Sequence, residues 1–508
     1  MYAKRIGNGV IYEFDSLEEL RSFDYSYVEN SKSELMREIA DSLKTSEGRL
    51  KNFKPILKED LGRGFTFELY DSKYICRISD TTSIEDIRRY DDAVQELANL
   101  TESFVSYYDL SLPLCAAENV ISQFVKLPLS MGFQERYIVG NTYSYKEDDN
   151  FIGSTYLLPF YQMIGEKCKQ IFHAKYTDAR TLTGMNCLMM VLTALSEYGE
   201  NILILGSEAG GHSSVKPIAE RLGLNVSEVP FDYEKMDIDY ELLNKMIERK
   251  KVQYVLLAPS DLIKAPHVEN INTSQTMLLY DASQTLGLIG GGLIENPLDN
   301  VDNIVMFGGT HKTFPGPASG LILTNSELIH SRLERTINPI YIRHTQMHQK
   351  VSLLFALVEF EVFGRQYQER ILSLSNMLAK ELSGMGFDVG KNSRRWTDTH
   401  QVFIYTDEDT MNRIYNNGLR LGVTLNKKKK ALFKGYGIRL GTQEIARYGW
   451  PVEEMKTVAT VLQELAEKNL PDDRLRKHLM ALPNKEIQYT FDQSINARFE
   501  RFINGEIE

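Results

Sequence analysis

The chain has 508 residues, 43% hydrophobic and 25% charged, and its 69 acidic against 58 basic side chains give a net charge of −11. That charge disfavours a general nucleic-acid-binding protein, which needs a basic surface. The four cysteines show no CxxC spacing, which disfavours a disulfide scaffold or a cysteine zinc site. The N-terminus lacks an apolar signal core and no apolar stretch is long enough to span a membrane. We therefore expect a cytoplasmic protein that binds neither nucleic acid nor membrane.

Residues 1–105 are rich in charge and contain no chemical motif. Their apolar runs predict strands at Gly9–Phe14, Thr66–Leu69 and Tyr74–Ile78, and helices at Ser16–Arg21, Ser33–Leu43 and Ile84–Ala98. We interpret this region as an N-terminal α+β appendage of unknown role.

Residues 106–340 form the predicted large domain. From about residue 150, short apolar runs alternate with amphipathic stretches, a pattern typical of a mostly parallel sheet covered by helices on both faces. The predicted strands are Asn201–Leu205, Val252–Ala258, Thr276–Tyr280, Asn303–Phe307 and Gly320–Thr324, and the predicted helices are Tyr156–Phe172, Asn186–Ser196, Val215–Leu222 and Tyr240–Arg249. Ligands of such α/β sheets bind at the carboxyl ends of the strands.

Residues 341–485 form a predicted smaller C-terminal α+β domain. It opens with a long helix over Val351–Leu382 and closes with a helix over Val452–Lys468. The predicted strands between them are Val402–Tyr405, Val423–Leu425 and Ile438–Leu440. Residues 486–508 are predicted to be a tail.

Polar groups follow the predicted strands of the large domain. Because parallel strands end at one edge of a sheet, these groups are expected to gather there. They are His212, Ser260, Asp281, His311 and Lys312, together with Thr183-Gly184-Met185 at a helix start.

This set suits pyridoxal phosphate. That cofactor needs a lysine amine for a Schiff base and a carboxylate beside its pyridine nitrogen, which keeps the ring an electron sink. It also needs a helix N-terminus and hydroxyl groups for its phosphate. An imidazole supplies a flat group to cover the ring. We therefore expect a pyridoxal phosphate-dependent enzyme.

The order of these motifs resembles the serine hydroxymethyltransferase family, which has the aspartate-aminotransferase-like fold, fold type I of the pyridoxal phosphate enzymes. The resemblance covers about residues 110–470. Its strongest segment is Gly308-Gly309-Thr310-His311-Lys312-Thr313, followed by Gly316-Pro317 and Gly320-Leu321-Ile322-Leu323. Further matches are Gly210-Gly211-His212, Asp281-Ala282-Ser283-Gln284 and Gly437-Ile438-Arg439-Leu440-Gly441-Thr442.

The resemblance implies a role for each matching residue. Lys312 would hold the cofactor, Asp281 would pair with the pyridine nitrogen and His212 would stack on the ring, while Tyr137 or His311 would relay protons. Arg439 would bind the substrate carboxylate, because its planar fork suits that group. The residues implied to border the cofactor also include Thr183, Gly184, Met185, Ser260, Gln284 and Thr310.

Departures from the family pattern concern the reaction. Without a gap, Val139 falls where the family has a proton-handling glutamate, whereas a shifted register would place Glu135 there. Gln284 replaces a histidine and Ala117 replaces a serine. The use of tetrahydrofolate therefore stays open.

The function implied by the resemblance is to make or break the Cα–Cβ bond of a small amino acid such as glycine, serine or threonine, through an external aldimine and a quinonoid. The alternatives are a folate-independent aldolase or transaldolase, another biosynthetic reaction such as amino transfer or decarboxylative condensation, and a non-catalytic scaffold. The family also implies a homodimer.

Two weaker features remain. The run Lys427–Lys430 is interpreted as a solvated loop, with a site for an anionic substrate as the alternative. His344 and His348 have helical spacing, but no HExxH motif accompanies them, so no metal site is predicted.

Overall fold

The computed structural model describes residues 2–6, 9–14, 57–60, 66–70, 73–79, 84–138, 153–468 and 471–503. It divides into two compact units, Met1–Asp109 and Leu110–Glu508. Within the described residues, no helix is both long and apolar enough to cross a membrane.

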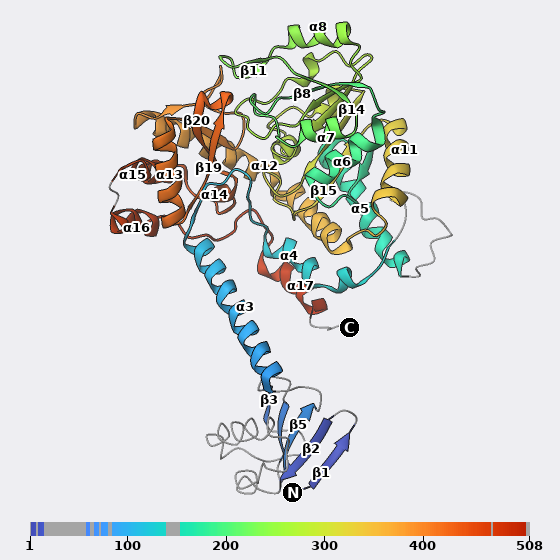
Figure 1. Ribbon diagram of the computed structural model, residues 1–508, viewed down its shortest axis with the longest axis vertical. Helices are drawn as coiled ribbons and strands as arrows, with labels where there is room; N and C mark the ends of the chain where they lie inside the picture. Colours follow the sequence, from blue (N-terminus) through green and yellow to red (C-terminus); the bar gives the residue numbers. More distant parts are fainter. Residues whose placement is uncertain are drawn as a thin grey trace. The chain divides into compact units, whose positions relative to one another are not determined.

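The first unit contains an antiparallel sheet of order β1-β2-β5-β4-β3 and one long helix (Figure 1). The predicted strands lie within β2, β4 and β5, whereas the predicted helices Ser16–Arg21 and Ser33–Leu43 lie outside the described residues. The elements are β1 (Tyr2–Ile6), β2 (Gly9–Phe14), β3 (Leu57–Asp60), β4 (Thr66–Tyr70), β5 (Lys73–Ser79) and α3 (Ile84–Leu110).

The second unit is built on a seven-stranded sheet of order β7-β15-β14-β13-β12-β8-β9. The five strands from β14 to β9 are parallel to one another, which confirms the predicted mostly parallel α/β sheet. The strands are β7 (Tyr176–Asp178), β8 (Asn201–Ile204), β9 (Asn225–Glu228), β12 (Tyr254–Leu257), β13 (Met277–Asp281), β14 (Ile304–Gly309) and β15 (Gly320–Thr324).

One strand differs from the prediction. Gly320–Thr324, predicted as part of the parallel array, runs antiparallel to both β14 and β7. The reason is the connection Thr310–Ser319, which contains no helix. A parallel return needs a crossover of about a dozen or more residues, so this shorter segment brings the chain back in the opposite direction.

Alternate residues of each central strand enter different cores, because side chains of a strand point to opposite faces. On β14, Ile304 and Met306 pack with helices α5 (Ser154–Phe172) and α12 (Met347–Gly384), whereas Val305 and Phe307 pack with α6 (Gly184–Leu195), α7 (Val215–Arg221) and α11 (Glu327–Thr336). Burial on both faces explains why these strands read as continuous apolar runs.

Helix α12 belongs to both parts of the second unit (Figure 1). Its first half packs in the core beneath the large sheet, and its second half packs against the sheet β16-β17-β20-β19. That smaller domain contains β16 (Asp388–Val389), β17 (Gln401–Tyr405), α13 (Glu408–Leu421), β18 (Val423–Thr424), β19 (Asn426–Lys430), β20 (Gly435–Gly441), α14 (Gln443–Arg447), α15 (Met455–Leu465) and α16 (Asp472–Met480).

The lysine run is a strand rather than a solvated loop. Residues Asn426–Lys430 form β19, which pairs with β20 at the edge of the smaller sheet. An edge strand tolerates charge, because one side of its backbone faces no neighbour.

The segment predicted as a tail contains helix α17 (Gln493–Ile503). Its Phe499 ring contacts those of Phe124 and Phe355, on α4 (Gln123–Ser130) and α12. Thr490, just before this helix, donates a hydrogen bond to the buried Glu359. The segment therefore contributes to the core.

Candidate active site

The carboxyl ends of β8, β12, β13 and β14 bring the predicted polar residues to one edge of the sheet. Gly211 bridges to Pro259, and the His212 N–H donates to the Ala258 carbonyl at 2.9 Å. Asp281 is the last residue of β13, and His311 and Lys312 follow the end of β14. Strand order therefore juxtaposes residues that lie up to 100 positions apart, such as His212 and Lys312.

Lys312 and Asp281 influence one another electrostatically. Burial lowers the pKa of Lys312, although Asp281 opposes that change. Burial also raises the pKa of Asp281, against the hydrogen bonds from Ser283 and the charge of Lys312. A lysine with a lowered pKa is a better nucleophile, because more of it is neutral amine.

The two histidines differ in their partners. Nδ1 of His212 accepts from the Ser214 N–H at 3.3 Å, so the proton of a neutral His212 ring is on Nε2. Nδ1 of His311 is buried without a hydrogen-bond partner among the described residues. Burial lowers the pKa of both rings. Burial therefore favours the neutral form of both imidazole rings.

The N-terminus of α6 is the candidate site for the cofactor's phosphate and is termed here the Gly184 cradle. Thr183 caps this helix, accepting from the Asn186 N–H at 3.1 Å. A Cβ on Gly184 would lie 2.7 Å from the Gly309 nitrogen and 2.9 Å from Ser283 Oγ, so only glycine lets the start of α6 approach Gly309 and Ser283 this closely. A helix N-terminus favours an anion through its free N–H groups and its dipole.

These observations test whether pyridoxal phosphate fits the residues present. A Cβ on Gly309 would lie 3.4 Å from Nδ1 of His311 and 3.5 Å from the Gly184 nitrogen, so the unpartnered histidine nitrogen lies beside the start of α6. Lys312 and Asp281 supply the amine and the carboxylate that the cofactor needs. The residues therefore fit this cofactor.

Lys350 is a buried lysine that contacts the loop before α6. Its ammonium nitrogen donates to the Thr181 carbonyl and to Ser319 Oγ, at 2.7 Å each. Burial lowers the pKa of this lysine to about 7. Lys350 thereby ties the loop before α6 to the loop that follows Lys312.

Thr310 and Gln284, two of the predicted cofactor neighbours, form hydrogen bonds with other residues of the protein. Thr310 Oγ1 donates to the Pro317 carbonyl at 2.6 Å, and Gln284 Oε1 accepts from Gln401 Nε2 at 3.0 Å. Gln401 also donates to the Ser260 carbonyl at 3.0 Å, so it joins the segments after β12 and β13. Met185, next to Gly184, is partly buried in the core around α6.

Arg439 is buried on β20 and lies against the segment that follows β12. Its Nη1 donates to the Ser260 carbonyl at 2.9 Å and to Asp261 Oδ1 at 2.8 Å. Its Nε and Nη2 both donate to Asn426 Oδ1, at 3.2 and 2.7 Å. A substrate carboxylate would therefore share these donors with protein acceptors.

Tyr137 and Glu135, which are predicted to handle protons, both lie in exposed positions. Tyr137 is 42% exposed and stacks on His344 with ring centroids 4.2 Å apart, and no described contact joins it to Lys312. Glu135 is exposed and lies 3.9 Å from Arg136. Val139, the alternative to Glu135, lies outside the described residues.

The structure adds residues that sequence reasoning missed. Ser283 Oγ accepts from the Gly309 N–H at 2.8 Å and its own N–H donates to Asp281 at 2.8 Å. Asp261 forms ion pairs with Lys428, Lys430 and Arg439. The available signals were the Ser260-Asp261 pair shortly after a buried strand and the run of four consecutive lysines, Lys427–Lys430.

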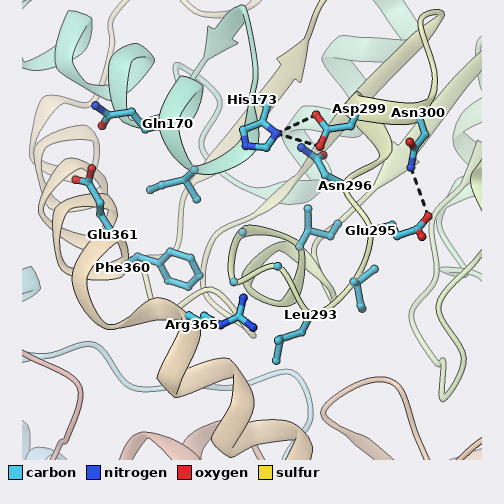
Figure 2. A pocket seen from close by; sticks show the side chains of 16 residues that line it. Gln170, His173, Leu293, Glu295, Asn296, Asp299, Asn300, Phe360, Glu361 and Arg365 are labelled. Atoms are coloured by element: carbon cyan, nitrogen blue, oxygen red, sulfur yellow. Dashed lines mark hydrogen bonds and ion pairs between the residues drawn. The ribbon is translucent and has the colours of Figure 1, made fainter.

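A separate cleft lies away from this edge of the sheet. It has a volume of about 790 Å³ and is lined by the end of α5, the turn Gly290–Gly292 and the middle of α12. In Figure 2, His173 points towards Asp299, to which it lies 2.9 Å away. None of the predicted site residues lines this cleft.

Comparisons with known proteins point to one family. The family model described as serine hydroxymethyltransferase matches residues 90–462. The serine hydroxymethyltransferase of Sulfolobus acidocaldarius is 28% identical over 403 residues, covering 75% of this chain and 90% of that protein. The enzyme of the same name from Methanobrevibacter smithii is 28% identical over 434 residues, covering 81% and 99%.

Among solved structures, this chain is similar to L-threonine transaldolase from Pseudomonas fluorescens in its internal aldimine state. The TM-score is 0.76 with 24% identity, over 83% of this chain and 99% of that one. This likeness concerns the fold.

Proposed function

Because the chain belongs to the serine hydroxymethyltransferase family, we propose that it uses pyridoxal phosphate to make or break the Cα–Cβ bond of a small α-amino acid. The observation that carries this proposal is the meeting of Lys312, Asp281 and the Gly184 cradle at one sheet edge. When bound, the cofactor supplies an electron sink for the electrons of the broken bond.

The residues around the ring have distinct tasks in this proposal. Lys312 offers its amine to the cofactor, which its lowered pKa favours. Asp281 would pair with the pyridine nitrogen and would stabilise positive charge there. His212 covers the ring, and the start of α6 with Thr183 and Gly184 holds the phosphate.

Arg439 binds the substrate carboxylate in this proposal. Fixing that group would orient Cα for the reaction, which is catalysis by positioning. His311 or Tyr137 relays protons during the reaction. The family further suggests that the protein is a cytoplasmic homodimer.

A second candidate is transfer to a carbonyl acceptor without folate. It is favoured by the exposure of Glu135, whose carboxylate lies 3.9 Å from the Arg136 guanidinium. In this reaction, the acceptor would be an aldehyde.

The first experiment is spectroscopic. The purified protein with pyridoxal phosphate should show a visible absorbance band, and glycine should move it to longer wavelength. Borohydride reduction followed by mass spectrometry should then locate the cofactor on Lys312. A chain that gives no band and no adduct would contradict the proposal.

The two candidate reactions are separated by the folate requirement. Serine cleavage that depends strictly on tetrahydrofolate supports hydroxymethyl transfer. Exchange of aldehydes on threonine or serine without tetrahydrofolate supports the second candidate.

A further inference from the structure

Four charged side chains form a cluster beside the proposed active site, here termed the Asp261 cluster. Asp261 Oδ1 lies 2.8 Å from both Lys428 Nζ and Arg439 Nη1, and its Oδ2 lies 2.8 Å from Lys430 Nζ. The Asp261 side chain is fully buried, and the exposed fractions of Lys428 and Lys430 are 16% and 15%. One carboxylate therefore holds three cations in a largely buried place.

Strand alternation produces this arrangement. Successive side chains of β19 point to opposite faces, so Asn426, Lys428 and Lys430 share the face that meets Arg439 and Asp261. Lys427 and Lys429 are exposed on the other face, over the rings of Tyr415 and Tyr436. The run of four lysines thus contains two inward and two outward side chains.

The cluster carries two more positive charges than negative ones. In the described part of the chain, no ion pair other than those with Asp261 forms to Lys428, Lys430 or Arg439. The nearby Glu208 is bound to the Ala431 N–H at 2.6 Å and is exposed. Charges removed from water require compensation, so a cluster with this excess attracts an anion.

The cluster adjoins the groups assigned to the cofactor. The N–H groups of Ser260 and Asp261 donate to the Gly210 carbonyl, two residues before His212. The charges of Asp261 and Lys428 both shift the pKa of His212, and the charge of Asp261 also shifts the pKa of Lys312. The Asp261 cluster therefore lies beside the groups assigned to the cofactor.

We propose that Lys428 and Lys430 bind a second anionic group, a phosphate or carboxylate, on the substrate in addition to its α-carboxylate. This inference rests on the proposed function. The α-carboxylate compensates one positive charge at Arg439, and the second group compensates the other at the two lysines. Charge-assisted hydrogen bonds from lysine ammonium groups suit the oxygens of either anion.

The second anion can come from the amino acid or from its carbonyl partner, and two arms distinguish these sources. In the first, calorimetry compares O-phospho-L-serine with L-serine on the holoenzyme. In the second, the glycine-loaded holoenzyme is given glycolaldehyde phosphate or glycolaldehyde. The phosphorylated member of one pair should bind about tenfold tighter or more.

Strand β19 itself provides the matched control. Lys428→Met with Lys430→Met should abolish the preference for the phosphorylated ligand and change binding of the ligand without phosphate by less than about threefold. Lys427→Met with Lys429→Met removes the same charge from the opposite face and should preserve the preference. The single variants Lys428→Met and Lys430→Met serve if the inward pair fails to fold.

The outcomes separate this inference from the proposed function. Equal binding of both members in each pair, or equal losses in the inward and outward variants, overturns the inference, and the glycine-dependent band still tests the reaction. Calorimetric binding of a phosphorylated ligand that depends on Lys428 and Lys430, in a protein without that band, supports the anion site and contradicts the reaction.

Discussion

Asn119 donates a hydrogen bond from its side chain to the backbone carbonyl of Lys312, which lies 193 residues further along the chain. The same amide donates to the Tyr367 hydroxyl at 2.8 Å, and that hydroxyl donates to the Gln443 carbonyl at 2.8 Å. The backbone of the proposed cofactor lysine is thus fixed by the N-terminal part of the unit and by α12.

Asn119→Ala removes the donor to the Lys312 carbonyl. A partly buried carbonyl left without a donor lowers the free energy of unfolding by about 1–3 kcal/mol. The value of kcat/KM should fall as well, by up to about 100-fold, because the backbone of Lys312 is held less firmly. Cofactor affinity should change much less, because the phosphate cradle is untouched. Steady-state kinetics and cofactor titration measure both. Unchanged kcat/KM would show that Lys312 needs no such support.

Gly184→Ala tests the phosphate cradle. Its Cβ would meet the Gly309 nitrogen at 2.7 Å and Ser283 Oγ at 2.9 Å, so the start of α6 must move. The dissociation constant of pyridoxal phosphate should rise by about tenfold or more, which is roughly 1.4 kcal/mol. Fluorescence titration measures it.

Gly384→Ala is the matched control, since a Cβ there has no atom within 4 Å. It should leave cofactor affinity unchanged. If Gly184→Ala binds the cofactor as tightly as this control, the phosphate does not lie at the start of α6.

Arg439→Lys tests the carboxylate site. A lysine keeps the charge but loses the planar fork, so the substrate KM should rise while cofactor binding persists. The loss of a charge-assisted hydrogen bond, about 1.5–3 kcal/mol, predicts a roughly 10- to 150-fold fall in kcat/KM. Kinetics with glycine or serine measure this. A wild-type KM in Arg439→Lys would assign the carboxylate to another group.

His400 makes the stability of the protein depend on pH. Its ring is buried, Nε2 lies 3.0 Å from the Ala116 carbonyl, and burial lowers its pKa to about 3. Between pH 6.5 and 3 the unfolded state binds a proton that the folded state does not, so stability falls as the pH falls, by about 1.4 kcal/mol per pH unit.

His400→Gln should remove this contribution, because glutamine can still donate to the Ala116 carbonyl and does not titrate. Between pH 7 and pH 5 the wild type should lose about 2 kcal/mol more unfolding free energy than the variant. Urea denaturation at both pH values measures the difference. His173→Gln, at the surface, is the control. Parallel losses in wild type and His400→Gln would contradict this role of His400.

Glu359 connects three parts of the second unit. Its carboxylate accepts from Ser122 Oγ at 2.7 Å and from Thr490, and it pairs with the buried Arg447. Glu359→Ala should destabilise the protein by about 3–5 kcal/mol, because it leaves Arg447 buried without its partner.

The control for Glu359 is on the same helix. Glu361 pairs with Lys167 and is 40% exposed, so Glu361→Ala should cost less than about 1 kcal/mol. Denaturation curves compare the two variants. Similar losses in both would show that burial does not set the strength of the Glu359 pair.

Several features followed from the sequence because their causes are local. The apolar runs predicted the central strands, since residues buried on both faces are apolar throughout. The positions of Asp281, Lys312 and Thr183-Gly184 at strand ends and a helix start predicted a shared edge. The antiparallel β15 was missed because strand direction depends on the length of the connection rather than on the strand's own residues.

Only the tertiary structure decided the partners of these residues. From the sequence, the run Lys427–Lys430 shows only that this segment is positively charged. The pairing of β19 with β20 decides that Lys428 and Lys430 face Asp261 while Lys427 and Lys429 face outwards. Likewise, neither Asn119 nor Lys350 carries a local signal of its role at the loops around Lys312. A side chain's type depends on the sequence at one position, whereas its contacts depend on segments that folding brings together from far apart in the chain.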